Sequence, residues 1–180
     1  SMKDEALEIS QRPRVSEAQA ATIARELFGV EGVLKELGSH QDRNFRIESG
    51  GVRRVLKIAN RGWGVQTLEA QNAAMLHVAQ RDPGLGAPLP LTALDGAFTG
   101  SYEIDGERLP IRLLSYVEGQ PLTGRRYLAP EVIADLGAVA GRICAALADF
   151  ADPGLVRRVQ WDLREGAAIA TALHGSIRDP

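Results

Sequence analysis

Lys57 is the residue in this sequence with the clearest capacity for chemistry. It stands between apolar neighbours in the run Val55-Leu56-Lys57-Ile58-Ala59. In a strand, Val55 and Lys57 share one face, because side chains alternate from one side to the other. An ammonium group is costly to bury unless it is paired. Two interpretations follow: a solvent-facing lysine on an edge strand, which this segment taken alone favours, or a cation that meets an anionic ligand.

Two further features favour the anionic ligand. Residues 38–44 form a loop of small and polar residues between the first two predicted strands. Backbone N–H groups of such a loop bind phosphate oxygens well, although an ordinary hairpin loop has the same composition. Glu69 lies one turn into the predicted helix that follows the lysine strand, and it could reach back to orient the ammonium group of Lys57. A solvated glutamate on a helix face is the alternative for Glu69.

Composition excludes several classes of protein. Apolar residues make up 44% of the 180 residues and charged residues 24%, which is typical of a globular protein in water. The net charge of −2 gives no basic excess for nucleic acid. No apolar run approaches the roughly 20 residues of a membrane span, and no signal region is apparent, so we expect a cytoplasmic protein. Cys144, the single cysteine, is expected to be a small buried residue and excludes a disulfide within one chain.

The elements that must position Lys57 can be read from local signals. Ser16 and Gln19 form a capping box that starts a helix reaching about Phe28. The pair Gly50-Gly51 predicts a hairpin between two strands, which puts Lys57 on the return strand. The remaining elements are a short strand over residues 32–37, a helix over 65–80, and strands near 89–94, 100–104 and 109–116.

Beyond Gly119 the pattern becomes helical. Pro130 suits a first helical turn, and apolar residues recur every three or four positions as far as Phe150. A last helix is predicted over residues 161–173. The whole order predicts an α+β fold, with a five- or six-stranded antiparallel sheet, one inserted helix, and the start of an all-helical region. The expected parts are a leader over residues 1–15, a sheet-containing lobe over 16–117, and a helical part over 118–180.

Five segments in this order resemble the aminoglycoside phosphotransferase/choline kinase superfamily, with the hydroxylysine-kinase-like branch as the nearest. Each segment alone is a modest signal, but together they span about residues 16 to 166. The resemblance implies a nucleotide-binding lobe of the protein-kinase-like fold and the start of its C-terminal lobe. The segments are 41–47 (QDRNFRI), 55–58 (VLKI), 69–75 (EAQNAAM), 112–119 (RLLSYVEG) and 161–164 (WDLR).

The resemblance also implies roles. Lys57 would contact the α- and β-phosphates of ATP or GTP, with Glu69 as its ion-pair partner. Val55 would cover the nucleobase, and the loop would cover the phosphates, although a solvated histidine is an equal interpretation of His40. Residues 115–117 would be the hinge whose backbone reads the base edge. The implied nucleotide-binding residues are Ser39, His40, Asn44, Val55, Lys57, Glu69, Ser115, Tyr116 and Val117.

The superfamily's catalytic residues are not in this sequence. Its His-x-Asp-x-x-x-x-Asn loop and later acidic magnesium ligand do not occur. The tripeptide His174-Gly175-Ser176 resembles the start of that loop, but Ser176 stands at the position that needs Asp. No catalytic residue and no magnesium ligand is therefore assigned here. We expect an inactive fragment of a longer, magnesium- and ATP-dependent kinase whose substrate is a small hydroxylated amine or amino acid.

A different class of function is kept beside this one. The chain could be a non-catalytic kinase-like module that binds a ligand or positions another domain. The partners implied by the kinase interpretation are nucleotide, a small-molecule substrate, the rest of the C-terminal lobe and an aminotransferase domain fused in the same parent chain. The apolar helix at 130–150 would lack its covering lobe, so self-association of the fragment is expected.

Overall fold

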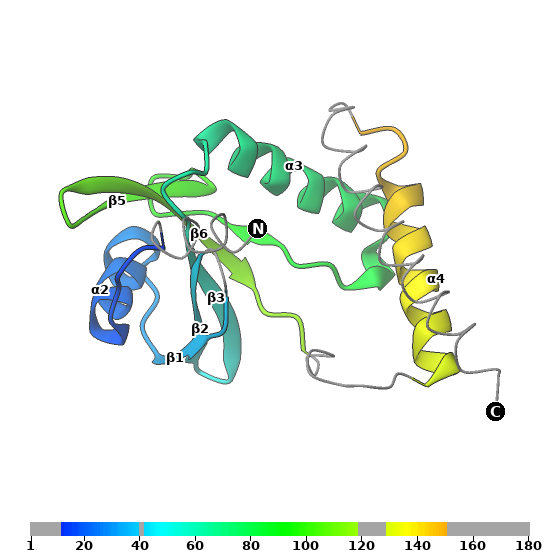
Figure 1. Ribbon diagram of the computed structural model, residues 1–180, viewed down its shortest axis with the longest axis horizontal. Coiled ribbons are helices and arrows are strands. Elements are labelled where there is room, and N and C mark those ends of the chain that lie inside the picture. Colours follow the sequence, from blue (N-terminus) through cyan, green and yellow to red (C-terminus); the bar gives the residue numbers. More distant parts are fainter. Residues whose placement is uncertain (1–11, 40–41, 119–128, 151–180) are drawn as a thin grey trace, which may run out of the picture. The chain divides into compact units, whose positions relative to one another are not determined.

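The computed structural model describes residues 12–39, 42–118 and 129–150 (Figure 1). His40 and the helix expected over residues 161–173 lie outside this part of the chain. The contacts divide the chain into two compact units. One holds the residues up to Ala73 together with Pro88–Val117, and the other holds Ala74–Ala87 together with the residues from Glu118 onward.

Helix α2 (Glu17–Phe28) confirms the capping-box prediction. The Ser16 hydroxyl accepts from the Gln19 backbone N–H at 3.2 Å, and the Gln19 side chain accepts from the Ser16 N–H at 2.9 Å. Gly29 ends the helix in the left-handed conformation, with φ of 65°, as a glycine cap allows. The predicted apolar stripe is buried and turns the helix toward the sheet.

The sheet has six antiparallel strands, which confirms the predicted α+β fold (Figure 1). Its order is β1-β2-β3-β6-β4, and β5 also pairs with β6. Strand β3 therefore lies between β2 and β6, so Lys57 is not on an edge strand. The strands are β1 (Val33–Leu37), β2 (Arg43–Ser49), β3 (Val52–Ile58), β4 (Pro90–Leu91), β5 (Thr99–Ile104) and β6 (Glu107–Ser115).

The main core lies between α2 and one face of the sheet. Phe45, Leu56 and Ile58 are fully buried there, and α2 contributes Ile23 and Phe28. Phe45 pairs with Leu56 across β2 and β3. Because strand residues alternate between faces, this packing leaves Lys57 on the opposite face.

Strand β4 is shorter than the sequence predicts. A strand was expected over residues 89–94, but only Pro90–Leu91 pairs, opposite β6. After Leu91 the backbone bonds elsewhere: the Ala93 N–H donates to the Ala97 carbonyl at 2.7 Å and the Leu94 N–H to the Leu27 carbonyl at 2.8 Å, so these residues do not lengthen the ladder with β6.

The remaining helices are α3 (Val65–Arg81), which is followed by a short 3₁₀ turn (Pro83–Leu85), and α4 (Pro130–Ala146). In the second unit the end of α3 packs on the end of α4 through a small core that includes Val78 and Leu147. Cys144 is only half-buried, so its expected burial is corrected. None of the helices in the described ranges is long and apolar enough to cross a membrane.

Helix α4 ends at Ala146, four residues before the predicted end at Phe150. The N–H groups of Ala148 and Phe150 bond to carbonyls three residues back, which tightens the last turn. Leu136 and Val139 are each 42% exposed on this helix. Self-association through that apolar surface stays a prediction.

Gly32, the residue before β1, lies closer to neighbouring backbone than the other described glycines do. A Cβ at this position would lie 2.2 Å from the Glu48 carbonyl oxygen, whereas one at Gly38 would meet nothing within 4 Å. We expect Gly32→Ala to lower the free energy of unfolding by about 1–3 kcal/mol, as overpacking does. The control, Gly38→Ala, should leave it unchanged or slightly raised. Urea denaturation checks this, and equal midpoints for the two variants would contradict it.

Candidate functional site

A row of four polar side chains crosses the face of the sheet opposite the α2 core. Asn44 on β2 is paired with Lys57 on β3, which is paired with Arg112 on β6, which is paired with Thr99 on β5. Directly paired residues of an antiparallel sheet project to the same side. The register therefore places two cations side by side, with a polar residue at each end of the row.

Lys57 is half-buried in this row. Its Nζ donates to Asn44 Oδ1 at 3.3 Å. Burial lowers the pKa of Lys57, the Asp42 carboxylate acts in the opposite direction, and the Arg112 guanidinium lowers the pKa further. The ammonium group thus has a neutral hydrogen-bond partner, and no carboxylate of the described residues lies within ion-pair distance of it.

Glu69 takes a different place from the one that the resemblance implies. It is exposed on α3, and among the described ion pairs none joins it to Lys57. Its negative charge acts on Arg112 instead, where it raises the guanidinium pKa. The structure therefore brings Lys57 together with Asn44 rather than with Glu69.

Arg112 is the functional candidate that sequence reasoning missed. It is only 4% exposed, and its Nη1 donates to Asn72 Oδ1 at 3.2 Å. Asn72, on α3 and 1% exposed, donates in turn to the Thr99 hydroxyl at 3.0 Å. Burial lowers the pKa of Arg112, against the opposing charges of Asp42 and Glu69. A charged residue between apolar neighbours was the available signal, the same one that singled out Lys57.

The loop before β2 is anchored at Asp42. The Asp42 N–H donates to the Ser39 hydroxyl at 3.3 Å, and its Oδ1 accepts from the Asn60 N–H at 2.9 Å. The Arg12 side chain also donates to the Asp42 carbonyl at 3.2 Å. These contacts hold the end of the loop, and the negative charge of Asp42 acts on both Lys57 and Arg112.

The segment expected to be the hinge, residues 115–117, begins at the last residue of β6. The backbone N–H of Ser115 donates to Leu89 at 2.8 Å, and that of Tyr116 donates to Arg53 at 3.3 Å. Both amides are therefore engaged by neighbouring backbone. Val117 is 51% exposed, and its N–H makes no hydrogen bond within the described part of the chain. Val55, half-buried on the face of Lys57, is paired with Leu114 just before this segment.

Comparison with known proteins identifies the family. A sequence profile described as "Phosphotransferase enzyme family" matches residues 33–178, which is most of the chain. The chain belongs to this phosphotransferase family. A search of curated proteins finds no match. The family profile covers all three predicted parts of the site: the loop, the lysine strand and the hinge segment.

Solved structures of small-molecule kinases share the fold of this phosphotransferase-family chain. An amicoumacin kinase in complex with AMP-PNP and Ca²⁺ has a TM-score of 0.62 at 14% identity, covering 87% of this chain and 45% of that one. A microcompartment-associated aminopropanol kinase has a TM-score of 0.55 at 16% identity, covering 74% of this chain and 40% of that one. A spectinomycin phosphotransferase in complex with ADP and spectinomycin has a TM-score of 0.53 at 10% identity, covering 80% of this chain and 41% of that one. The chain spans less than half the length of each.

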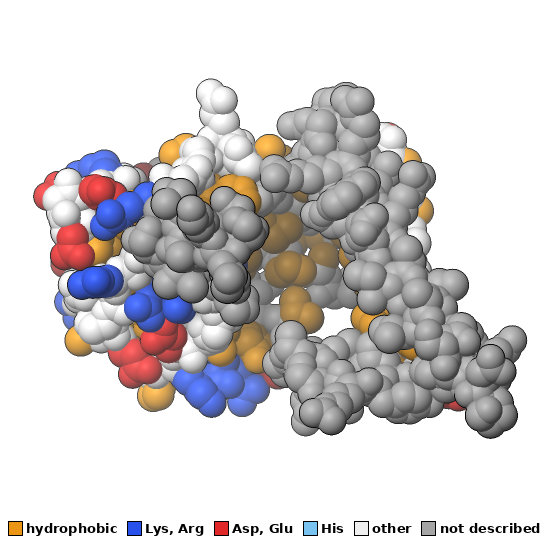
Figure 2. Space-filling view, in the orientation of Figure 1, with side chains coloured by type: hydrophobic (Ala, Val, Ile, Leu, Met, Phe, Trp, Pro, Cys, Tyr) orange, Lys and Arg blue, Asp and Glu red, His pale blue; other side chains and the backbone are white. Residues whose placement is uncertain are grey.

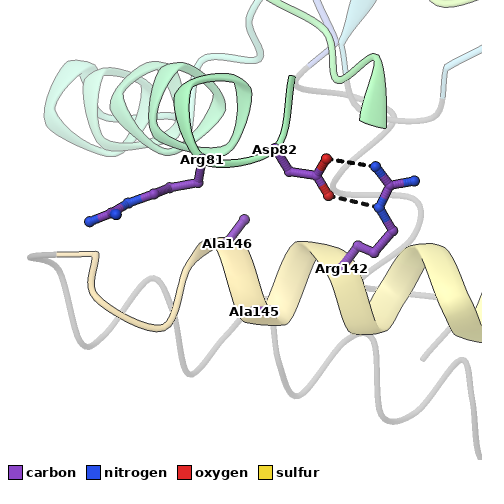
Figure 3. A pocket seen from close by; sticks show the side chains of 5 residues that line it. All are labelled: Arg81, Asp82, Arg142, Ala145 and Ala146. Atoms are coloured by element: carbon purple, nitrogen blue, oxygen red, sulfur yellow. Dashed lines mark hydrogen bonds and ion pairs between the residues drawn. The ribbon is translucent and has the colours of Figure 1, made fainter. Parts of the chain in front are cut away.

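The second unit contains a cavity of its own. It measures about 280 Å³, and Arg142 closes one side by donating to both carboxylate oxygens of Asp82, at 2.7 and 2.6 Å (Figure 3). The hydrogen bond from Arg142 lowers the pKa of Asp82. No predicted site residue lines this cavity. Its lining is Arg81, Asp82, Arg142, Ala145 and Ala146.

Acidic and basic side chains are interspersed over the visible part of the first unit (Figure 2). Within residues 12–39, 42–118 and 129–150, no group of three or more His, Cys, Asp or Glu side chains could hold a metal ion.

Proposed function

We propose that this chain is the nucleotide-phosphate-binding part of an ATP-dependent small-molecule phosphotransferase. The observation that carries the proposal is Lys57 itself. Its ammonium group is half-buried on an interior strand, and within the described residues its hydrogen-bond partner is the neutral Asn44 amide. A partly buried cation gains most from an anionic partner, and a phosphate oxygen is the partner that this family's chemistry supplies.

Three neighbouring features support a nucleotide as the ligand. The loop that Asp42 anchors lies at the Lys57 end of the strands, because Asn44 pairs with Lys57, and this loop would cover the phosphates. Val55 shares the face of Lys57 two residues away, where it would contact a base. The N–H of Val117, which makes no hydrogen bond within the described residues, would donate to the base edge. The similar structures solved with AMP-PNP and with ADP agree with an adenine nucleotide, and GTP is the alternative.

The remaining parts of the reaction are assigned outside these 180 residues. Phosphoryl transfer needs an acidic residue at the acceptor hydroxyl and ligands for magnesium, and neither motif occurs in the sequence. We therefore propose that a longer polypeptide supplies them and that the acceptor is a hydroxylated amine or amino acid. The role of this chain is to hold and orient the phosphates, with Lys57 neutralising their charge.

The pH dependence of nucleotide binding tests this function. Only the protonated Lys57 attracts phosphate, and burial lowers its pKa below the ordinary value of 10.5. The affinity for ADP or ATP should therefore fall as the pH rises through that lowered pKa, in a window below 10.5. Calorimetric titration measures this, on the chain and on a longer polypeptide that contains it.

Two controls sharpen the titration. Adenosine has no phosphate, so its binding should show no fall in this window. Lys57→Arg keeps its charge to much higher pH and should remove the fall for ADP. An ADP affinity that does not depend on pH in the native chain, or no nucleotide binding by the longer polypeptide, would overturn the proposed function.

A non-catalytic module is the second candidate. One observation favours it: Glu69 does not pair with Lys57, whereas active protein kinases require their lysine–glutamate ion pair. Such a module would bind nucleotide with the same pH dependence but transfer no phosphate. Assaying ADP release by the longer polypeptide with a panel of amino alcohols and hydroxylated amino acids separates the two candidates.

A further inference from the structure

Arg112 is a buried cation, with a residue exposure of 4%. Among the described residues, its side chain donates one hydrogen bond, to the neutral side chain of Asn72. Within the described residues, no Asp or Glu lies at ion-pair distance from it. Buried charges in proteins are otherwise paired or bound to an ion. Arg112 therefore costs folding free energy that its own contacts do not offset.

The position of Arg112 suggests a function for its buried charge. It is the direct cross-strand neighbour of Lys57 on β6, on the same face of the sheet. Two positive charges on adjacent strands repel each other when no anion is present. A ligand with several negative charges would relieve the repulsion, and the gain would be large because the site is partly removed from water.

We propose that Arg112 is a positioning residue that, with Lys57, makes the site selective for a polyphosphate. The inference rests on the proposed function of Lys57. Arg112 is too deeply buried to be a surface ligand, so it acts through its charge on Lys57 and on the phosphates. Asn72 on α3 accepts from the guanidinium and is itself held by the Thr99 hydroxyl on β5, to which it donates. The Asp42 and Glu69 carboxylates also face this charge and partly offset it.

Three variants separate the charge of Arg112 from its packing. Arg112→Met removes the charge and keeps most of the length of the side chain. Arg112→Lys keeps the charge but loses the guanidinium contact with Asn72. The double variant Arg112→Met with Asn72→Leu removes both polar partners, a replacement that is often neutral or stabilising. Arg108→Met is the matched control, because Arg108 is an exposed arginine of the same strand.

Calorimetry with inorganic tripolyphosphate, ADP and AMP measures the effect at low salt. We expect Arg112→Met to weaken tripolyphosphate and ADP about tenfold, a change of the size that one nearby charge produces, and to weaken AMP less. Arg112→Lys and Arg108→Met should stay within about threefold of the native affinity. The double variant should bind as weakly as Arg112→Met while unfolding at or above the native temperature.

A purely structural role would give the opposite pattern. Arg112→Lys would then lose as much affinity as Arg112→Met, and the double variant would recover binding with its stability. Either result would overturn the inference.

A second measurement needs no nucleotide. The sequence has three lysines, Lys3, Lys35 and Lys57, so ¹³C-lysine NMR can follow each titration, with Lys57→Arg assigning the signal. Arg112→Met should raise the pKa of Lys57, and Arg112→Lys should leave it unchanged. An unchanged Lys57 pKa in folded Arg112→Met sinks the inference even where polyphosphate binds. Failure of the native chain to bind polyphosphate counts against the proposed function instead.

Discussion

Lys57→Met is expected to lower phosphoryl transfer by a polypeptide containing this chain at least about 100-fold, the scale seen when one electrostatic stabiliser is removed from an active site. Methionine fills a similar volume but cannot neutralise phosphate oxygens. Since the ammonium group is half-buried and, in the part of the chain that the structure describes, has the neutral Asn44 amide as its partner, its removal should leave the free energy of unfolding unchanged or slightly higher. Steady-state kinetics and urea denaturation measure the two effects.

Lys35→Met is the matched control for this experiment. Lys35 is an exposed lysine of the same sheet, on the edge strand β1. Its replacement should change kcat and KM by less than about twofold, because an exposed charge far from the reacting groups is screened by solvent. Full activity of a folded Lys57→Met enzyme would return Lys57 to an ordinary strand residue and remove the basis of the proposed function.

Phe45→Ala is expected to lower the free energy of unfolding by about 3–5 kcal/mol, as the truncation of a buried aromatic side chain does. Phe45 is fully buried in the core between the sheet and α2. A loss of this size is a large fraction of the roughly 5–15 kcal/mol that stabilises an ordinary domain. Urea denaturation followed by circular dichroism gives the value directly.

The effect of Phe45→Ala should extend to the site on the other face. Phe45 is the chain neighbour of Asn44, which accepts the hydrogen bond from Lys57. A loosened β2 should therefore weaken ADP binding as well. Val52→Ala at the hairpin, where the side chain is 49% exposed, is the control and should cost less than about 1 kcal/mol. A Phe45→Ala chain as stable as the Val52→Ala chain would show that the core does not depend on this side chain.

Local sequence signals determined much of this protein. Ser16 and Gln19 specify the start of α2 through contacts three residues apart, and Gly50-Gly51 specifies the hairpin because both residues adopt positive φ. Alternating apolar residues around Lys57 identified β3 and its two faces. These signals act over a few residues, so they survive without knowledge of the fold. The family was recognised from a different signal, five short segments in order that resemble it, and the match over residues 33–178 confirms it.

Only the tertiary structure decided which residues meet Lys57. Whether a strand is central or at an edge, and which residue of β6 lies opposite position 57, depends on pairing between segments more than fifty residues apart. That register puts Arg112 beside Lys57. The Arg112 side chain then meets Asn72 of α3, and the charge of Glu69 acts on Arg112. Pairing with β6 likewise limits β4 to Pro90–Leu91. Burial and register are properties of the assembled chain, and one-residue shifts in pairing would reverse every one of these contacts.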